Sequence, residues 1–151
     1  MNRKILTLCI VHQDDRVLLG MKKRGFGMGK WNGFGGKVQE NESIEAAAKR
    51  ELFEEANIQV QELEQLGLLD FSWSKNPDQI LQVNIFKATQ FTGIPTETEE
   101  MKPEWFSIKD IPYEKMWADD IHWIPLFLEN KKFKGNFIFD DNNNVLEYRL
   151  D

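Results

Sequence analysis

The sequence lacks most of what a secreted, membrane or polyanion-binding protein uses. It contains one cysteine, Cys9, so no intrachain disulfide can form. It contains neither an apolar run of about 18 residues nor a charged and then apolar leader. Its formal net charge of −6 disfavours a nucleic-acid polymer as partner, because long nucleic-acid surfaces are bound by broad basic patches. These absences predict a cytoplasmic protein that acts on neither a membrane nor a nucleic-acid polymer.

The composition is that of an ordinary folded domain. Of the 151 residues, 41% are hydrophobic and 29% are charged, which excludes disordered and collagen-like classes. This length is enough to bury a core without disulfides or structural metals. No repeat, linker or low-complexity segment interrupts the chain. We therefore expect one domain over residues 1–151, with a monomer as the default.

The first third of the chain predicts a hairpin, a glycine loop and a helix. Two apolar runs, 4–12 and 16–21, flank a polar turn and are typical of paired strands. Residues 25–36 are rich in glycine, which suits tight turns and close approach of the backbone to a ligand. Small and apolar residues then recur at helical spacing, with Ser43 as the expected N-cap and Asn57 as a left-handed end.

The remaining two thirds predict more strands and a second helix. Strands are expected at 63–73, 80–90, 104–108, 133–139 and 145–150. The second helix is expected to begin at Asp119 or Asp120 and to run to about Asn130, with Pro125 inside it. Strands that alternate with two main helices in this order favour an α/β (α+β) fold, a sandwich built on a mixed sheet.

The densest chemical signal is the hexapeptide Arg50-Glu51-Leu52-Phe53-Glu54-Glu55. On a helix the three glutamates are related by i, i+3 and i+4, so their side chains project from one face. Like charges at this spacing repel one another, and a divalent cation would relieve the repulsion. The alternative for an isolated acidic cluster is a solvated helix face.

The spacing around the glutamates resembles the signature of the Nudix family. Gly36 is followed by five residues, Glu42, seven residues, Arg50-Glu51-Leu52, one residue, Glu54-Glu55, one residue and Asn57-Ile58. Asn57 stands where the family usually has glycine, and asparagine tolerates positive φ better than other non-glycine residues. The resemblance implies an α/β/α sandwich and a metal-dependent pyrophosphohydrolase.

The resemblance also implies roles for the acidic residues. The metal is expected to be Mg²⁺, with Mn²⁺ as the alternative, because carboxylates and phosphate oxygens suit hard cations. Its expected ligands are Glu51, Glu54, Glu55, Glu100 and the carbonyl of Gly35 or Gly36. Glu55 is the first choice for the catalytic base and Glu100 the second. Arg50 is expected to orient the glutamates or Glu42, or else to form a surface ion pair.

Residues 17–40 and 112–135 narrow the resemblance to the animal Nudix hydrolases of oxidised purine nucleoside triphosphates. Carried over position by position, the implied substrate contacts are Thr7, Lys22, Phe26, Asn32, Phe34, Gly35, Gly36, Lys37, Leu81, Trp117, Asp119 and Asp120. Leu81 replaces a methionine of that group, and the hairpin before it differs. The aromatic rings offer stacking faces for a base. Trp123 and Phe139 are assigned either to this pocket or to the core.

Asp119 and Asp120 carry the sharpest hypothesis on specificity. Two adjacent carboxyls in a partly dry pocket should not both ionise, so one pKa should rise. A carboxyl that can hold or release a proton would match the different donor and acceptor orders of 8-oxoguanine and 2-oxoadenine. The alternative is that Asp119 only caps the second helix.

The sequence therefore predicts an enzyme that hydrolyses 8-oxo-dGTP and 2-hydroxy-dATP to the monophosphate and pyrophosphate. This activity would remove oxidised purines from the nucleotide pool. Two alternatives stay open: a Nudix hydrolase of another nucleoside diphosphate derivative, since one helix serves many substrates, and a non-catalytic nucleotide-binding module.

Overall fold

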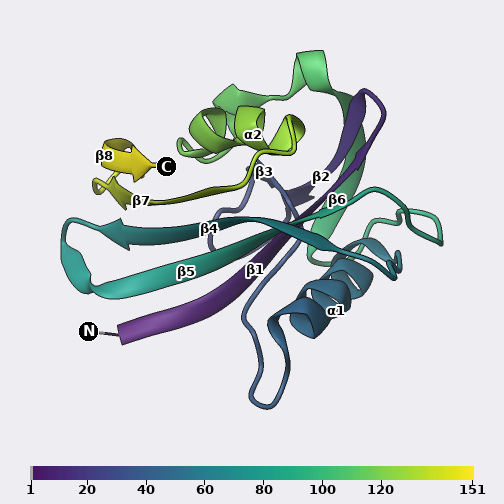
Figure 1. Cartoon of the computed structure of the whole chain (residues 1–151), viewed down its shortest axis with the longest axis horizontal. Helices are drawn as coiled ribbons and strands as arrows, with labels where there is room; N and C mark the ends of the chain where they lie inside the picture. The colour runs from purple at the N-terminus through teal and green to yellow at the C-terminus, as the bar shows by residue number, and fades with distance from the viewer. Residues whose placement is uncertain (1) are drawn as a thin grey trace.

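One mixed sheet with a helix on each face forms the framework of the protein (Figure 1). The computed structural model describes residues 2–151. Its strands are β1 (Asn2–Gln13), β2 (Arg16–Lys22), β3 (Trp31–Asn32), β4 (Glu64–Trp73), β5 (Asn76–Ala88), β6 (Met101–Ser107), β7 (Phe133–Phe139) and β8 (Val145–Leu150). Its helices are α1 (Ile44–Ala56) and α2 (Asp120–Leu128), with short 3₁₀ turns η1 (Ile108–Asp110) and η2 (Tyr113–Lys115).

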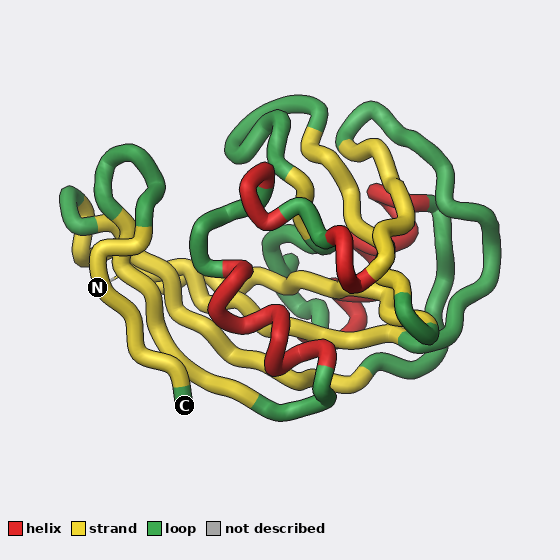
Figure 2. The backbone as a smooth tube through the Cα atoms, turned by 90° about the horizontal axis from the view of Figure 1, so that it is seen from above, coloured by secondary structure: helices red, strands yellow, loops and turns green. Residues whose placement is uncertain are grey.

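The strand order is β3-β2-β1-β5-β4-β7-β8, and β6 pairs with β2. The β1–β2 hairpin is antiparallel, as the sequence predicts, and β4 and β5 form a second antiparallel hairpin. Two long-range pairs, β1 with β5 and β4 with β7, are parallel. The sheet is therefore mixed. Its strands twist and fan out when the molecule is seen from above (Figure 2).

The predicted ends of α1 are confirmed. The Ser43 hydroxyl accepts a hydrogen bond from the backbone N–H of Ala46 at 3.1 Å. Asn57 ends the helix in the left-handed region, with φ 61° and ψ 32°, and its N–H donates to the carbonyl of Phe53. Asparagine thus supplies the conformation that glycine usually provides at this position. No helix within the described residues is both long and apolar enough to cross a bilayer.

Each helix covers its own hydrophobic cluster. The cluster under α1 comprises Cys9, Val11, Leu18, Phe34, Ala48, Leu52, Ala56, Ile58, Val60, Phe86, Ala88 and Met101. The larger cluster under α2 includes Trp123, Ile124, Phe127, Phe133, Phe137 and Phe139. Burial raises the pKa of the Cys9 thiol to about 12, so this cysteine is an apolar core residue.

A buried lysine fixes the end of α2 to the sheet. Lys87 lies on β5, and its Nζ donates to the carbonyl of Phe127 and to Oδ1 of Asn130, both at 2.7 Å. The Phe127 carbonyl also accepts from the N–H of Asn130, so the ammonium group adds a second bond at the end of this helix. The position of α2 on the sheet is set by this bond together with the packed aromatic rings.

The glycine segment lies directly against β1. Backbone hydrogen bonds join Phe34 to Cys9 in both directions, and the N–H of Thr7 donates to the carbonyl of Gly36. A Cβ atom on Gly35 would lie 1.8 Å from the carbonyl oxygen of Thr7. Only glycine permits this approach, because the obstacle is rigid backbone rather than a side chain.

We expect Gly35→Ala to destabilise the fold by about 2 kcal/mol or more, because the loop must move away from β1. Thermal unfolding by circular dichroism should show a midpoint lowered by about 2 to 4 °C for each kcal/mol lost. Lys37→Ala is the control, because Lys37 lies in the same loop with an exposed side chain. Equal midpoints for the two variants would contradict the close approach at Gly35.

Candidate active site

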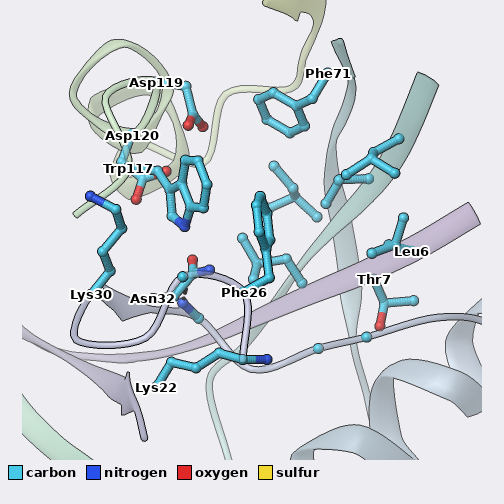
Figure 3. A pocket seen from close by; sticks show the side chains of 18 of the residues that line it. Leu6, Thr7, Lys22, Phe26, Lys30, Asn32, Phe71, Trp117, Asp119 and Asp120 are labelled. Atoms are coloured by element: carbon cyan, nitrogen blue, oxygen red, sulfur yellow. Dashed lines mark hydrogen bonds between the residues drawn. The ribbon is translucent and has the colours of Figure 1, made fainter. Parts of the chain in front are cut away.

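A pocket of about 220 Å³ lies beside the glycine segment and reaches the start of α2. Its walls come from β1, β4, β5, the segment from Lys22 to Gly36, and the residues around Asp119. Figure 3 shows Asp119, Asp120 and Trp117 on one side and Leu6 and Thr7 on the opposite side. Segments distant in sequence therefore meet around one cavity.

The acidic end of the pocket is formed by Asp119 and Asp120, which are only 4% and 3% exposed. Burial raises the pKa of both carboxyls, and for Asp120 the charge of Asp119 raises it further. Trp123 Nε1 donates to Oδ2 of Asp119 at 2.8 Å. The pair is thus suited to share or hold a proton at a pH where free carboxyls are ionised.

The alternative that Asp119 only caps α2 is wrong. Asp119 occupies the N-cap position but has helical backbone angles, φ −75° and ψ −26°, and its side chain makes no capping hydrogen bond. Its carboxylate is directed to Trp123 instead. The helix start places this carboxyl in the pocket and takes no cap from it.

Aromatic rings form an open wall near the Asp pair. Phe26 and Trp117 lie with ring centroids 5.1 Å apart and planes inclined by 39°. Lys30 Nζ lies 5.4 Å from the Trp117 ring. Phe26 is 64% exposed although it lines the pocket, so its ring presents uncovered apolar surface that a flat base could cover.

Two buried polar atoms of the pocket have no hydrogen-bond partner within residues 2–151: Thr7 Oγ1 and Asp120 Oδ2. A buried polar group left in this state costs about 1 to 3 kcal/mol. Asn32 is differently arranged, because its Oδ1 already accepts from the N–H of Gly33 at 2.9 Å. The polar atoms of the pocket are therefore arranged for a ligand that carries both donors and acceptors.

Glu55 joins the pocket to α1. Its carboxylate lines the cavity, and Oε1 accepts from the backbone N–H of Gly35 at 2.9 Å. Burial raises its pKa to about 8, with a further contribution from the charge of Glu51, although the Gly35 hydrogen bond opposes the rise. Glu55 is therefore a largely buried carboxyl that the Gly35 N–H holds at the wall of the pocket.

Arg50 connects the other acidic residues of α1. Its Nε donates to Glu42 at 2.7 Å and its Nη1 to Glu51 at 2.8 Å. Glu54 Oε2 lies 3.3 Å from the same Nη1, and Nη2 donates to the carbonyl of Lys37. Arg50 and its two nearest carboxylates, those of Glu42 and Glu51, are mostly buried. These contacts therefore orient the side chains and are not surface ion pairs.

The expected metal ligands come from α1, from the glycine segment and from the residue before β6. Across residues 2–151, no three acidic, histidine or cysteine side chains converge on one point. Glu54 is exposed, and Glu100 forms a 2.6 Å ion pair with Arg24.

The donor set nevertheless fits a hard divalent cation. Glu51 and Glu55 are partly or largely buried, and burial raises the pKa of both. A cation would offset the cost of holding these charges together. Glu51 also lies against Gly36, where an added Cβ would be 2.8 Å from its Cδ, so the glycine segment and α1 are in close contact here.

Most of the predicted substrate residues line the cavity. They are Thr7, Lys22, Phe26, Asn32, Gly35, Gly36, Leu81, Trp117, Asp119 and Asp120. Phe34 and Lys37 are not among the residues that line the cavity. The Phe34 ring is fully buried in the cluster under α1, because alternate residues of a segment paired with β1 face opposite sides. The Lys37 side chain points into solvent.

Several residues that line the pocket were not predicted from the sequence. They include Lys30, Phe71, Trp73, Val83 and Ile85. A signal for two of them was present, because Leu81, Val83 and Ile85 are two residues apart on β5 and so share one face. Trp73 follows Phe71 at the same spacing on β4. Trp123 and Phe139 belong both to the core and to the pocket wall.

Comparisons with known proteins agree with this geometry. The sequence profile of the NUDIX domain matches residues 2–127. The chain is 51% identical to the oxidized purine nucleoside triphosphate hydrolase of Mus musculus over 97% of this chain and 94% of that protein. The protein of the same name from Danio rerio is also 51% identical, over 98% of this chain and 94% of its own length.

A solved structure also resembles this chain in both fold and sequence. The crystal structure of the mutator MutT protein from Bacillus halodurans superposes with a TM-score of 0.85 at 33% identity, covering 98% of this chain and 97% of that one. The profile match spans most of the chain and includes the glycine segment, α1 and the strands from β1 to β6. The chain therefore belongs to the Nudix family of hydrolases.

Proposed function

We propose that this Nudix hydrolase cleaves oxidised purine nucleoside triphosphates, such as 8-oxo-dGTP and 2-hydroxy-dATP, to the monophosphate and pyrophosphate. The observation that carries the proposal is the buried Asp119–Asp120 pair at one end of the pocket whose other end reaches Glu55. The relatives from mouse and zebrafish, half identical over nearly the whole chain, carry the matching name.

The acidic pair supports recognition of an oxidised base. A protonated carboxyl donates a hydrogen bond and an ionised one accepts, so the pair offers both at once. Oxidation at C8 of guanine, or at C2 of adenine, rearranges donors and acceptors along the base edge. Because burial favours one retained proton, Asp119 and Asp120 suit either order when the proton changes place. Phe26 and Trp117 supply the faces against which the base stacks.

The glutamates of α1 serve the phosphates. Glu51, Glu54 and Glu55, with Glu100 and the Gly35 carbonyl, would hold Mg²⁺ or Mn²⁺, and such a cation supplies charge neutralisation on the phosphates and holds them for attack. Arg50 keeps Glu51 oriented toward Gly36. Lys22, at the edge of the pocket, adds a positive charge for the triphosphate.

Glu55 is placed to take the proton of the attacking water. Water attacks a phosphorus atom of the α–β linkage, the bond to the leaving oxygen breaks, and the water proton passes to the Glu55 carboxylate. The Gly35 N–H holds that carboxylate in one orientation. In-line displacement of this kind depends on positioning more than on covalent chemistry.

Release of pyrophosphate from a substrate panel tests the proposal directly. With Mg²⁺ present, we expect kcat/KM to be higher for 8-oxo-dGTP and 2-hydroxy-dATP than for dGTP, because only the oxidised bases match the acidic pair. ADP-ribose and a dinucleoside polyphosphate belong in the same panel. Equal rates on oxidised and unmodified purines, or a preference for ADP-ribose, would refute the proposed substrate.

Glu55→Gln should lower kcat by about 10² to 10⁴, because the amide cannot accept the proton of water. Circular dichroism should show an unchanged fold. Glu45→Gln is the matched control, since Glu45 lies on the same helix with an exposed side chain, and its turnover should equal that of the unmodified protein. Removal of divalent cations with EDTA should stop turnover in the unmodified protein and in Glu45→Gln. An active Glu55→Gln protein would exclude Glu55 as the base.

Asp120→Asn should weaken oxidised-purine binding about tenfold and stabilise the fold. Burial raises the pKa of Asp120 in the folded chain well above its usual 3.8. A carboxyl with a raised folded pKa lowers stability as the pH rises from 3.8 through that pKa. Asparagine carries no such cost, so the gain in melting temperature should be larger at pH 8 than at pH 5.

Melting temperatures at the two pH values and a titration with the product monophosphate check both halves of this expectation. Asp110→Asn, at an exposed aspartate, controls for loss of one negative charge. A gain at Asp120 that is equal at pH 5 and pH 8 would show that the carboxyl is not held in its protonated form.

A further inference from the structure

The β4–β5 turn and the β7–β8 turn meet at the outer edge of the pocket. One hydrogen bond between these two regions is made by a residue of the pocket wall, Trp73. Trp73 is the last residue of β4 and lines the cavity. Its indole Nε1 donates to Oδ1 of Asn143, in the turn between β7 and β8, at 2.8 Å. Asn143 does not line the cavity itself. The β4–β5 turn and the β7–β8 turn lie on the same side of the molecule in Figure 1.

The turn that carries Asn143 is rigidly built. Asp140 Oδ1 accepts from the backbone N–H groups of Asn142 and Asn144, both at 2.9 Å. The N–H of Asn143 donates to the carbonyl of Asp140, and Asn143 has φ 64°. Asparagine tolerates this left-handed conformation, so the turn presents its carboxamide in a fixed position.

Backbone pairing holds this turn against the β4–β5 turn. The N–H of Ser74 donates to the carbonyl of Phe139 at 2.9 Å, next to the register pair of Trp73 and Phe139. Lys75 and Asp141 form a 2.8 Å ion pair farther out, but both side chains are largely exposed. An exposed pair of this kind contributes little. The indole bond to Asn143 is therefore the contact that can orient a side chain of the pocket.

Trp73 also touches the rings that would surround the base. Its ring centroid lies 5.2 Å from Phe139 and 6.0 Å from Phe26, and its plane is nearly perpendicular to that of Trp117, at 83°. The indole is larger than a phenyl ring and asymmetric, so its rotation would change the shape of the cavity. A hydrogen bond at one edge selects one orientation.

We propose that Asn143 is a positioning residue that fixes the indole of Trp73, and that Trp73 in this orientation is a specificity-determining wall for the purine base. This inference rests on the proposed function, because it concerns how the same pocket fits its substrate. It assigns to the β7–β8 turn, outside the pocket, an influence on the Michaelis constant.

Steady-state kinetics on 8-oxo-dGTP and 2-hydroxy-dATP test the inference with three variants. Asn143→Gly removes the acceptor but keeps the left-handed backbone favourable. Trp73→Phe removes the donor but keeps an aromatic ring. Asn143→Asp restores an acceptor oxygen at a residue that tolerates the same backbone. Lys75→Met, which breaks only the exposed ion pair of the same two turns, is the control.

We expect Asn143→Gly to raise KM about three- to tenfold, the effect of losing one hydrogen bond, with kcat within about twofold of the unmodified value. Asn143→Asp should restore KM, and Lys75→Met should leave it unchanged. In the double variant with Trp73→Phe, Asn143→Gly should add no further increase, because the bond is already absent.

Three results would overturn the inference. The first is an unchanged KM in Asn143→Gly, and the second is increases in KM that multiply in the double variant. The third is a loss of both kcat and stability in Asn143→Gly that Asn143→Asp does not restore. The last would mean that Asn143 serves only the fold. These failures are distinct from failure of the proposed function, which would appear in the unmodified protein as no preference for oxidised purines over dGTP.

Discussion

The hydrogen bond from the backbone N–H of Gly35 to the Glu55 carboxylate links the two halves of the active site. It exists because Gly35 can lie against the carbonyl of Thr7, where any side chain would collide with backbone. The same approach brings Thr7 to the pocket wall and Gly36 to Glu51. The proposed sites for the base and for the phosphates are thus connected through β1, which pairs with β2 on one side and with β5 on the other.

Helix α1, which carries the glutamates, could be predicted from the sequence because the residues that specify it are close together in the chain. Ser43 and Asn57 mark its ends by their own conformational preferences, and the glutamates share a face by helical spacing alone. The strands of both hairpins were likewise predictable from short apolar runs around polar turns. Mixed pairing needed the structure, because parallel contacts such as β4 with β7 join segments about 65 residues apart through a connection that no local pattern specifies.

Some features of the pocket could likewise be predicted from the sequence, and others needed the structure. The resemblance named Asp119, Trp117 and Asn32, which line the cavity, but it could not say which partners these groups have in this chain. The ion pair of Glu100 with Arg24 and the contact of Trp73 with Asn143 depend on side chains from loops far apart in sequence. The resemblance also could not show that the Phe34 ring faces the cluster under α1, because one residue of shift along a paired segment moves a side chain to the other face of the sheet.

The charges of the cavity explain why an acidic protein can bind a polyanion. Three carboxylates line it, those of Glu55, Asp119 and Asp120, against the two ammonium groups of Lys22 and Lys30. With every group ionised, the cavity would repel a triphosphate. Burial favours a retained proton on the aspartate pair, and a divalent cation held by the α1 glutamates, as proposed, would reverse the sign of the field at the other end. On the proposed function, affinity for the substrate would therefore depend on one proton and on bound metal, and the two requirements would act at opposite ends of a single pocket.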